Sequence, residues 1–296
     1  MPRKQHALVV LSACLLLLVV SARVRAQQPA NDLSLSTPVE PGAKATDLDL
    51  IRMVLPDVVE DDHGNTIAHK TTDLRNLFDD KDEPGSYEGD IKLESFIKRP
   101  LRAGAHRDWC YLFTLNSTGA DNLFTWGDAH VVALFRLEPQ PRLLDAAEVQ
   151  DDRFVDLSSV IAIGPHKEAL IIANSHSNSS EGYLQLTVIS AEQDRLRLVY
   201  DQAQIVRANA CGYNFDMTPD LTPIKQGRGT HYPLRLRVKL ELMADDPSCE
   251  HRRRTRAVTR YYQAPLVWQP KQRQYVVRGH GMDWIDRFEK AYINQP

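Results

Sequence analysis

The stretch FVDLSSVIAIGPHKEALIIANSHSNSSEGYLQLTVISAEQDRLRLVYD, residues Phe154–Asp201, decides the fold. It contains four short apolar runs, and a polar segment rich in turn-forming residues separates each run from the next. Such alternation is typical of β-strands joined by tight turns. Because the runs are too closely spaced for helices between them, they predict an antiparallel meander. The four expected strands are Ser159–Ile163, Ala169–Ala173, Tyr183–Ser190 and Arg195–Tyr200.

The same pattern continues on both sides of this stretch. It is strictest in Leu234–Leu242, where Leu or Val alternates with Arg, Lys or Glu. A period of two indicates one buried face and one wet face. We expect Arg256–Trp268 to be the partner strand. The fold class is therefore mainly β, an antiparallel meander in a sandwich or a partial propeller-like arrangement. Further strands are expected at Ile91–Ile97, Tyr111–Leu115, Val131–Leu137, Arg142–Val149 and Tyr275–Val277.

Two helices are expected at the ends of the β region. Asp47 is placed to cap a short N-terminal helix that ends before Pro56. Near the C-terminus, Trp284, Phe288 and Tyr292 recur every fourth residue, which indicates an amphipathic helix packed on the sheet. The predicted organisation is a signal peptide over residues 1–26, a flexible leader over 27–46 and a single β-rich domain over 47–296.

The N-terminal residues have the three parts of a secretory signal peptide. Arg3 and Lys4 precede an apolar core, Ala7–Val20, and a cut is expected before Gln27. Because this core is shorter than the ~20 residues that span a bilayer, we favour cleavage over a retained signal anchor. No later stretch is apolar enough to cross a membrane. The sequence thus predicts a periplasmic or secreted protein of bacterial type, with no transmembrane segment in the mature chain.

The charge of the mature chain argues against nucleic acid as a partner. Removing residues 1–26 leaves 36 − 4 = 32 basic residues against 39 acidic ones, a formal charge of −7. Binding to a phosphate backbone needs a clustered positive face. The one basic cluster, Arg252–Arg254 with Arg256, is interpreted as a solvated loop between two strands.

The cysteines predict one disulfide. The mature chain contains Cys110, Cys211 and Cys249. In an oxidising compartment, an odd number indicates one bridge and one remaining thiol. Cys110 lies in an apolar run, as a buried free cysteine would, and its role is not indicated. The other two lie in polar segments that flank Leu234–Leu242, so we pair Cys211 with Cys249.

A polar patch, Asn174–Gly182, supplies the catalytic candidates. It contains a potential base, His176, and an acid, Glu181. A hydrolase reading predicts that these two side chains meet Asp128 and His130 in one cleft. The competing interpretation of the patch is an ordinary hairpin loop, because Ser, Asn and Gly suit turns. For Asp128 and His130 it is a turn, Gly127–His130, before the strand Val131–Leu137. The chain contains neither a Gly-x-Ser-x-Gly elbow nor a zinc-binding His or Cys motif.

Asp80 and Asp82 are weak candidates for a calcium site. The segment that they open begins like an EF-hand loop, but Pro84 and Ile91 occupy positions where oxygen ligands belong. A solvated acidic loop is therefore the main interpretation. We expect no cofactor.

The leading hypothesis is an exported, non-catalytic binding or envelope-accessory module whose partner is an envelope component or another protein. The alternative is a hydrolase that acts on an envelope or extracellular substrate. A docking hypothesis uses the wet face of Leu234–Leu242 and names Arg235, Arg237 and Tyr261 as binding candidates. It predicts that this face is exposed and that the C-terminal helix does not cover it.

Overall fold

A computed structural model describes residues 35–79, 83–118, 124, 128–149, 154–178, 181–210, 213–225, 229–245, 247–249 and 254–293. The chain divides into two compact units, Met1–Thr37 and Pro38–Pro296, and the second contains every helix and strand given below. Val39 and Ala45 are buried, so the last part of the expected leader packs on the fold. None of the helices in the described ranges is long and apolar enough to cross a membrane.

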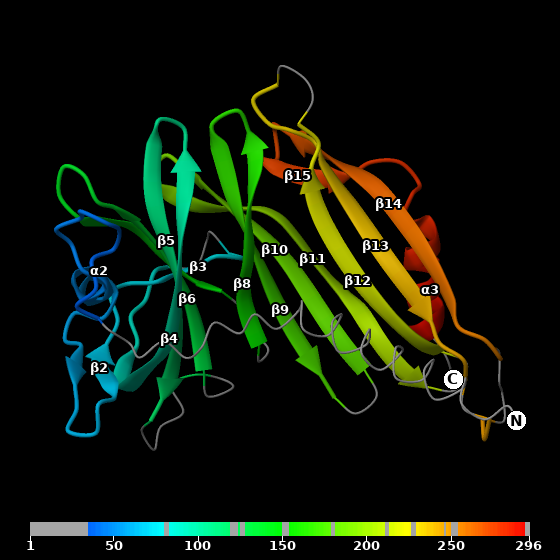
Figure 1. The fold of residues 1–296 in the computed structure, drawn as a ribbon, viewed down its shortest axis with the longest axis horizontal. Coiled ribbons are helices and arrows are strands. Elements are labelled where there is room, and N and C mark those ends of the chain that lie inside the picture. The colour runs from blue at the N-terminus through cyan, green and yellow to red at the C-terminus, as the bar shows by residue number, and fades with distance from the viewer. Residues whose placement is uncertain are drawn as a thin grey trace, which may run out of the picture. The chain divides into compact units, whose positions relative to one another are not determined.

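The second unit is mainly β, as predicted, and its strands form one sheet (Figure 1). The order is β15-β14-β13-β12-β11-β10-β9-β4-β5-β6-β7-β3, with β2 also pairing with β4, β1 with β2, and β8 with β9. The described strand pairs are antiparallel except for β3 and β7. The bounds are β1 Val59–Glu60, β2 Thr66–Lys70, β3 Arg75–Asn76, β4 Glu88–Ala103, β5 His106–Ser117, β6 Asp128–Arg136, β7 Arg142–Val149, β8 Phe154–Gly164, β9 Lys167–Ser177, β10 Glu181–Glu192, β11 Arg195–Ala210, β12 Tyr213–Pro223, β13 Leu234–Leu242, β14 Val258–Gln269 and β15 Gln274–Val277.

Most expected strands lie inside observed ones, and Arg142–Val149 and Leu234–Leu242 coincide with β7 and β13. Strand β12 and the short strands β1–β3 have no counterpart among the expected strands. The composition of β12 explains why, since its sequence YNFDMTPDLTP contains Asp and Pro, which are depleted in strands. Pairing with β13 over Phe215–Pro223 holds β12 extended despite this composition.

The polar patch Asn174–Gly182 joins the antiparallel strands β9 and β10, as expected of a hairpin, but most of the patch belongs to the strands themselves. Residues 174–177 continue β9, and residues 181–182 open β10. The turn between them is closed by the Asn178 amide, which donates to the Glu181 carbonyl at 2.9 Å. The turn expected at Gly127–His130 does not include Asp128–His130, because these residues begin β6 and pair with β5, while Gly127 lies outside the described residues. In both places, backbone pairing with a neighbouring strand outweighs the turn preference of the side chains.

Helix α2, Asp47–Val54, is capped by Thr46 and not by Asp47 as expected. The Thr46 hydroxyl accepts from the Asp49 amide, and the Asp49 carboxylate accepts from the Thr46 amide at 2.8 Å, which together form a capping box. Asp47 turns inward instead. Its buried carboxylate accepts from the Tyr111 hydroxyl at 2.5 Å and from Lys98 Nζ at 2.8 Å. This contact fastens α2 to β4 and β5.

Strand β9 is packed on both of its faces. Ala169 and Ile171 point into a core shared with β11–β15 and α3. Leu170 and Ile172 point the opposite way, into a core shared with β5–β7. Because side chains alternate along a strand, this division puts one core on each face of β9. Strand β10 is divided in the same way, with Val188 in the first core and Ile189 in the second.

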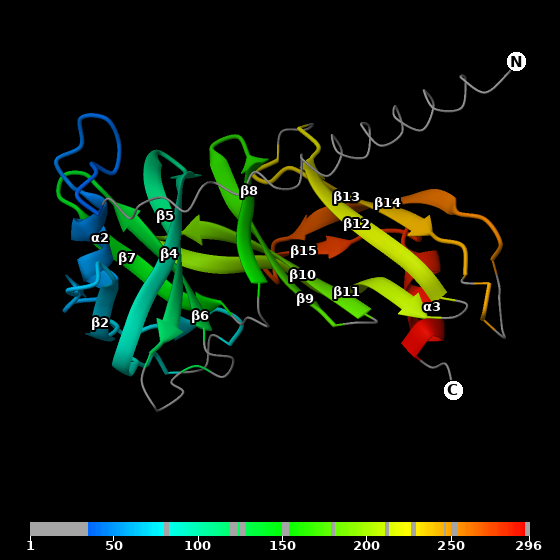
Figure 2. The ribbon, with the colours of Figure 1, turned by 60° about the horizontal axis from the view of Figure 1, so that its bottom comes forward.

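Helix α3, Asp283–Ile293, is the expected C-terminal amphipathic helix. Figures 1 and 2 show it in red against the C-terminal strands, while α2 lies with the N-terminal strands at the other end of the sheet. Phe288 meets Phe215 of β12 edge to face at 4.9 Å, and Trp284 stacks on Tyr262 of β14 at 5.1 Å. Such aromatic contacts add to the burial that holds the helix on the sheet.

The sheet forks between β11 and β12. Strand β11 pairs with β10 over Arg195–Ala208 but with β12 only over Arg207–Ala210. After Asp216, which pairs with Arg207, the rest of β12 pairs with β13 alone. At the fork, the Ile205 amide donates to Glu289 Oε1 of α3 at 2.6 Å. A helix side chain thus replaces the missing strand partner at this point.

Candidate binding surface

The alternation in β13 separates a buried face from a wet face, as expected. Leu234, Leu236 and the other apolar residues of β13 are at most 4% exposed. Arg235 and Arg237 lie between them on the opposite face and are exposed. The strand therefore presents a row of basic side chains that its own sequence period sets on one side.

Strand β14 adds an aromatic side chain to this row. Cross-strand pairing sets Tyr261 opposite Lys239 and Gln263 opposite Arg237, on the wet face. The Tyr261 side chain is 58% exposed, and the Arg237 guanidinium lies 4.6 Å from the centre of its ring. This geometry is a cation–π contact, which holds both side chains in a defined orientation.

These side chains surround a shallow cavity of about 320 Å³. We call it the β13–β14 pocket and define it by its lining residues. The structure thus places Arg235, Arg237 and Tyr261, the three binding candidates from the sequence, around one cavity. The lining residues are Arg235, Arg237, Tyr261, Tyr262 and Gln263.

The row of charges is balanced at one end. Lys239 Nζ lies 2.8 Å from Glu241 Oε2, and this hydrogen bond raises the pKa of Lys239. The two arginines at the other end have no ion pair among the described residues. The pairing of β12 with β13 sets Asp220 opposite Arg237 in register. The positive charge of the surface is therefore concentrated at Arg235 and Arg237, beside the aromatic ring.

Helix α3 leaves this surface uncovered. Tyr262 follows Tyr261 in β14 and points to the opposite face, where it stacks on Trp284 of the helix. The buried leucines of β13 share their core with Ile285 and Tyr292 of α3. The helix thus covers the apolar face of β13, which meets the condition that the docking hypothesis set.

Of the catalytic candidates, Glu181 has a visible structural role. Its carboxylate accepts from the Tyr292 hydroxyl of α3 at 2.5 Å and from the Tyr183 hydroxyl. The hydrogen bond from Tyr183, followed by that from Tyr292, lowers the pKa of Glu181. The side chain is therefore an ionised anchor for the C-terminal helix, and this state does not suit a proton donor.

The remaining catalytic candidates lie on two separate strands. His176 is half-buried on β9, opposite Tyr183 of β10. Asp128 and His130 lie on β6, and β4 and β5 stand between β6 and β9 in the sheet order. Asp128 accepts from Asn116 Nδ2 at 2.6 Å, and His130 is buried. The structure therefore places His176 and the Asp128–His130 segment on strands that are not neighbours in the sheet.

The metal and disulfide predictions fall partly outside the described residues. Asp80 and Asp82 lie there, and the described ranges contain no group of three or more His, Cys, Asp or Glu side chains that could hold a metal ion. Cys110 is free and buried, as expected, and burial raises the pKa of its thiol. Cys249 is disulfide-bonded. Because Cys211 is not among the described residues, its pairing with Cys249 stays a prediction.

Gln263 and Tyr262 line the β13–β14 pocket but are not among the binding candidates from the sequence, and of the two only Gln263 lies on the wet face. The signal was present, because Gln263 follows Tyr261 by two positions in an expected strand and so shares its face.

Comparison with family models, with curated proteins and with solved structures finds no match to this chain. Within the described ranges, the chain is mainly β, and strands β13 and β14 carry exposed basic and aromatic side chains on one face.

Proposed function

We propose that the protein is an exported, non-catalytic binding module that docks an envelope component or another protein on the β13–β14 pocket. One observation carries the proposal. Tyr261 remains 58% exposed although Arg237 holds its ring in place, and the exposed Arg235 lies beside them around a cavity of about 320 Å³. A tyrosine that Arg237 already orients loses little side-chain freedom when a partner covers it.

The residue types fit this role. Tyrosine and arginine are enriched at protein interfaces and in their energetically dominant positions. An aromatic ring buries a large apolar area, while the guanidinium groups pair with carboxylates in a bidentate geometry. The partner surface that complements Arg235 and Arg237 is therefore acidic and includes an apolar contact for Tyr261.

Export is the second part of the proposal. It is supported by the sequence of residues 1–26, with two basic residues before an apolar core and a small residue before the expected cut. The mass of the protein purified from the exported fraction tests it. We expect a chain that begins at Gln27, and a mass that includes residues 1–26 would contradict cleavage.

Site-directed photo-crosslinking tests the binding surface. A photo-reactive residue at Gln263 of the full chain, in cells that produce and export it, should give one defined adduct of higher mass. The double variant Arg235→Glu/Arg237→Glu should lose this adduct, because the reversed charges repel an acidic partner. The matched control is Lys44→Glu/Lys70→Glu, which makes the same change of net charge at exposed positions elsewhere. An adduct that survives in the first variant would exclude this surface as the docking site.

A further inference from the structure

The fork in the sheet leaves part of the outer edge of β11 without a strand. Over Arg195–Gln204, β11 pairs with β10 on one side only. Side chains close the two ends of this open stretch. Asp145 Oδ2 accepts from the Leu196 amide at 2.7 Å, and Arg75 donates to the Leu196 carbonyl at 3.0 Å. At the other end, Glu289 accepts from the Ile205 amide.

These end contacts show which backbone groups point outward. Residues of an antiparallel strand alternate between the partner side and the free side. The Leu196 amide points to the free side of β11, and so does the amide of Leu198, two residues later. The Ile205 amide also points to the free side, and counting back from it in steps of two adds the amides of Ala203 and Asp201. Within the described ranges, no strand or turn partner receives the amides of Leu198 and Ala203 at this edge. An open edge of this kind is a template for another strand.

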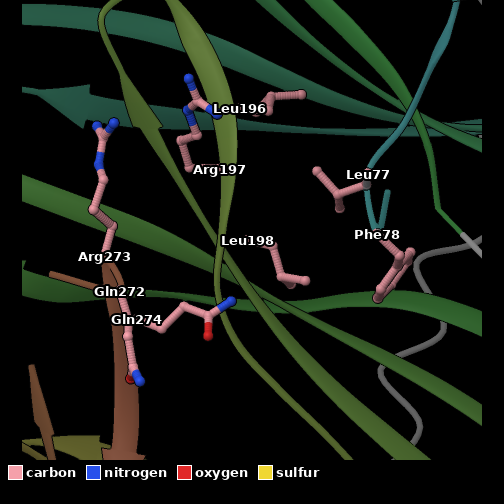
Figure 3. A pocket seen from close by; sticks show the side chains of 8 residues that line it. All are labelled: Leu77, Phe78, Leu196, Arg197, Leu198, Gln272, Arg273 and Gln274. Carbon is pink, nitrogen blue, oxygen red and sulfur yellow. The ribbon is translucent and has the colours of Figure 1, made fainter. Parts of the chain in front are cut away.

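A groove of about 260 Å³ lies along this open edge. Its floor is β11 at Leu196–Leu198. One wall is Leu77 and Phe78, the residues directly after β3 in the chain, and the other is the turn between β14 and β15. Figure 3 shows β11 passing between the two walls. We call this cavity the β11 groove. Its lining residues are Leu77, Phe78, Leu196, Arg197, Leu198, Gln272, Arg273 and Gln274.

The two walls differ in chemistry. Leu77 and Phe78 form an apolar wall, and Leu198 points toward them from the floor (Figure 3). Two basic side chains, Arg197 from β11 and Arg273 from the turn between β14 and β15, also line the groove (Figure 3). Arg273 also forms an ion pair with Glu192, but none of the lining residues is acidic. The groove is thus apolar on one wall and basic on the other.

We propose that the β11 groove binds an extended peptide segment of a partner protein, which adds as a strand to the open edge of β11. Main-chain hydrogen bonds to Leu198 and Ala203 provide affinity, as in other complexes formed by strand addition. Cross-strand neighbours share a face, so side chains next to Leu198 meet the apolar wall and those next to Arg197 meet the basic wall. The segment therefore alternates apolar and acidic residues. This site is separate from the β13–β14 pocket.

Binding of defined peptides tests the proposal. The probe is a fluorescently labelled ten-residue peptide of alternating valine and glutamate, titrated with the full chain and followed by fluorescence anisotropy. We expect saturable binding. Replacing glutamate with lysine should weaken binding at least about tenfold, and so should methylating the alternate backbone amides that face β11, because each lost hydrogen bond weakens binding about three- to tenfold. Undetectable binding, or binding that amide methylation leaves unchanged, would refute strand addition.

A matched pair of variants tests the edge itself. Ala203→Pro removes an outward amide at an exposed position, where a strand tolerates proline, and should weaken binding about three- to tenfold. Ala203→Val keeps the amide and should bind within about twofold of the unchanged chain. Equal binding by both variants would place the peptide elsewhere. Arg273→Gln should reduce the preference for glutamate over lysine, and an unchanged preference would exclude the basic wall.

Hydrogen exchange in the unchanged protein gives a readout that needs no variant. Bound peptide should slow exchange of the Leu198 and Ala203 amides, because both then become hydrogen-bonded. Unchanged exchange at both amides would overturn the proposal even if Ala203→Pro failed to fold. The variant Arg235→Glu/Arg237→Glu should bind the peptide as tightly as the unchanged chain. Loss of binding in that variant would assign the peptide to the β13–β14 pocket instead.

Discussion

Strands β9 and β13 belong to the same sheet, yet they differ in how many faces they bury. In β9, the consecutive residues Leu170, Ile171 and Ile172 are all buried, because a layer of strands covers each face. In β13, leucines are buried and the arginines between them are exposed. An unbroken apolar run and a strict alternation thus report two different positions in the fold. A wet face survives only where no second layer covers the strand.

The largest expected effect is the loss of stability when Asp is placed on each face of β9 and of β13. Ile171→Asp and Ile172→Asp should each destabilise the protein by about 4 kcal/mol or more, because both bury an unpaired charge. In β13, Leu236→Asp should do the same, while Arg237→Asp should leave the protein folded. Urea unfolding of the four variants measures the difference. A stable Ile171→Asp variant would mean that only one face of β9 is covered.

A close backbone contact should give the next largest effect. Gly164, at the end of β8, lies so near the Thr230 carbonyl oxygen that an added Cβ would be 2.5 Å from it. Gly164→Ala should therefore destabilise the protein by about 1–3 kcal/mol, by pushing the end of β8 away from the segment that precedes β13. Gly85→Ala is the control, because an added Cβ there meets nothing within 4 Å. Equal unfolding midpoints for both variants would contradict this close contact.

Acid should weaken the hydrogen bonds by which Glu181 anchors α3. The folded-state pKa of Glu181 is lowered by its tyrosine hydrogen bonds, so its contribution is present above its ordinary pKa of 4.5 and is lost as pH falls through the lower folded value. Melting temperatures measured between pH 6 and about pH 3 should therefore fall less steeply in Glu181→Gln than in the unchanged protein. Parallel curves for the two proteins would exclude this anchor.

The smallest expected effect concerns the wet face. Arg235→Ala/Arg237→Ala should change the free energy of unfolding by no more than about 0.5 kcal/mol, because exposed side chains contribute little to stability. The same variant should lose the crosslinked adduct at Gln263. A large loss of stability would indicate that these arginines hold the fold together and would weaken their assignment to binding.

The sequence predicted what depends on local pattern. The alternation of Leu234–Leu242 was enough to expect β13, its wet face, and the exposure of Arg235 and Arg237. Strand β12 was missed because Asp and Pro mask its extended state, and β13 supplies the pairing that overrides them. The β11 groove could not be predicted from the sequence, because its lining comes from three segments that are distant along the chain. These are Leu77–Phe78, Leu196–Leu198 and Gln272–Gln274.

The two cores share strands β9 and β10, and this has a consequence for how the chain comes apart. Removing the N-terminal strands would expose Leu170 and Ile172 to water, and removing the C-terminal strands would expose Ile171 and Val188. Neither half can therefore detach while the other half keeps its free energy of folding. We expect heat to unfold residues 38–296 in one cooperative transition, and fragments cut between β7 and β12 to have no stable fold of their own.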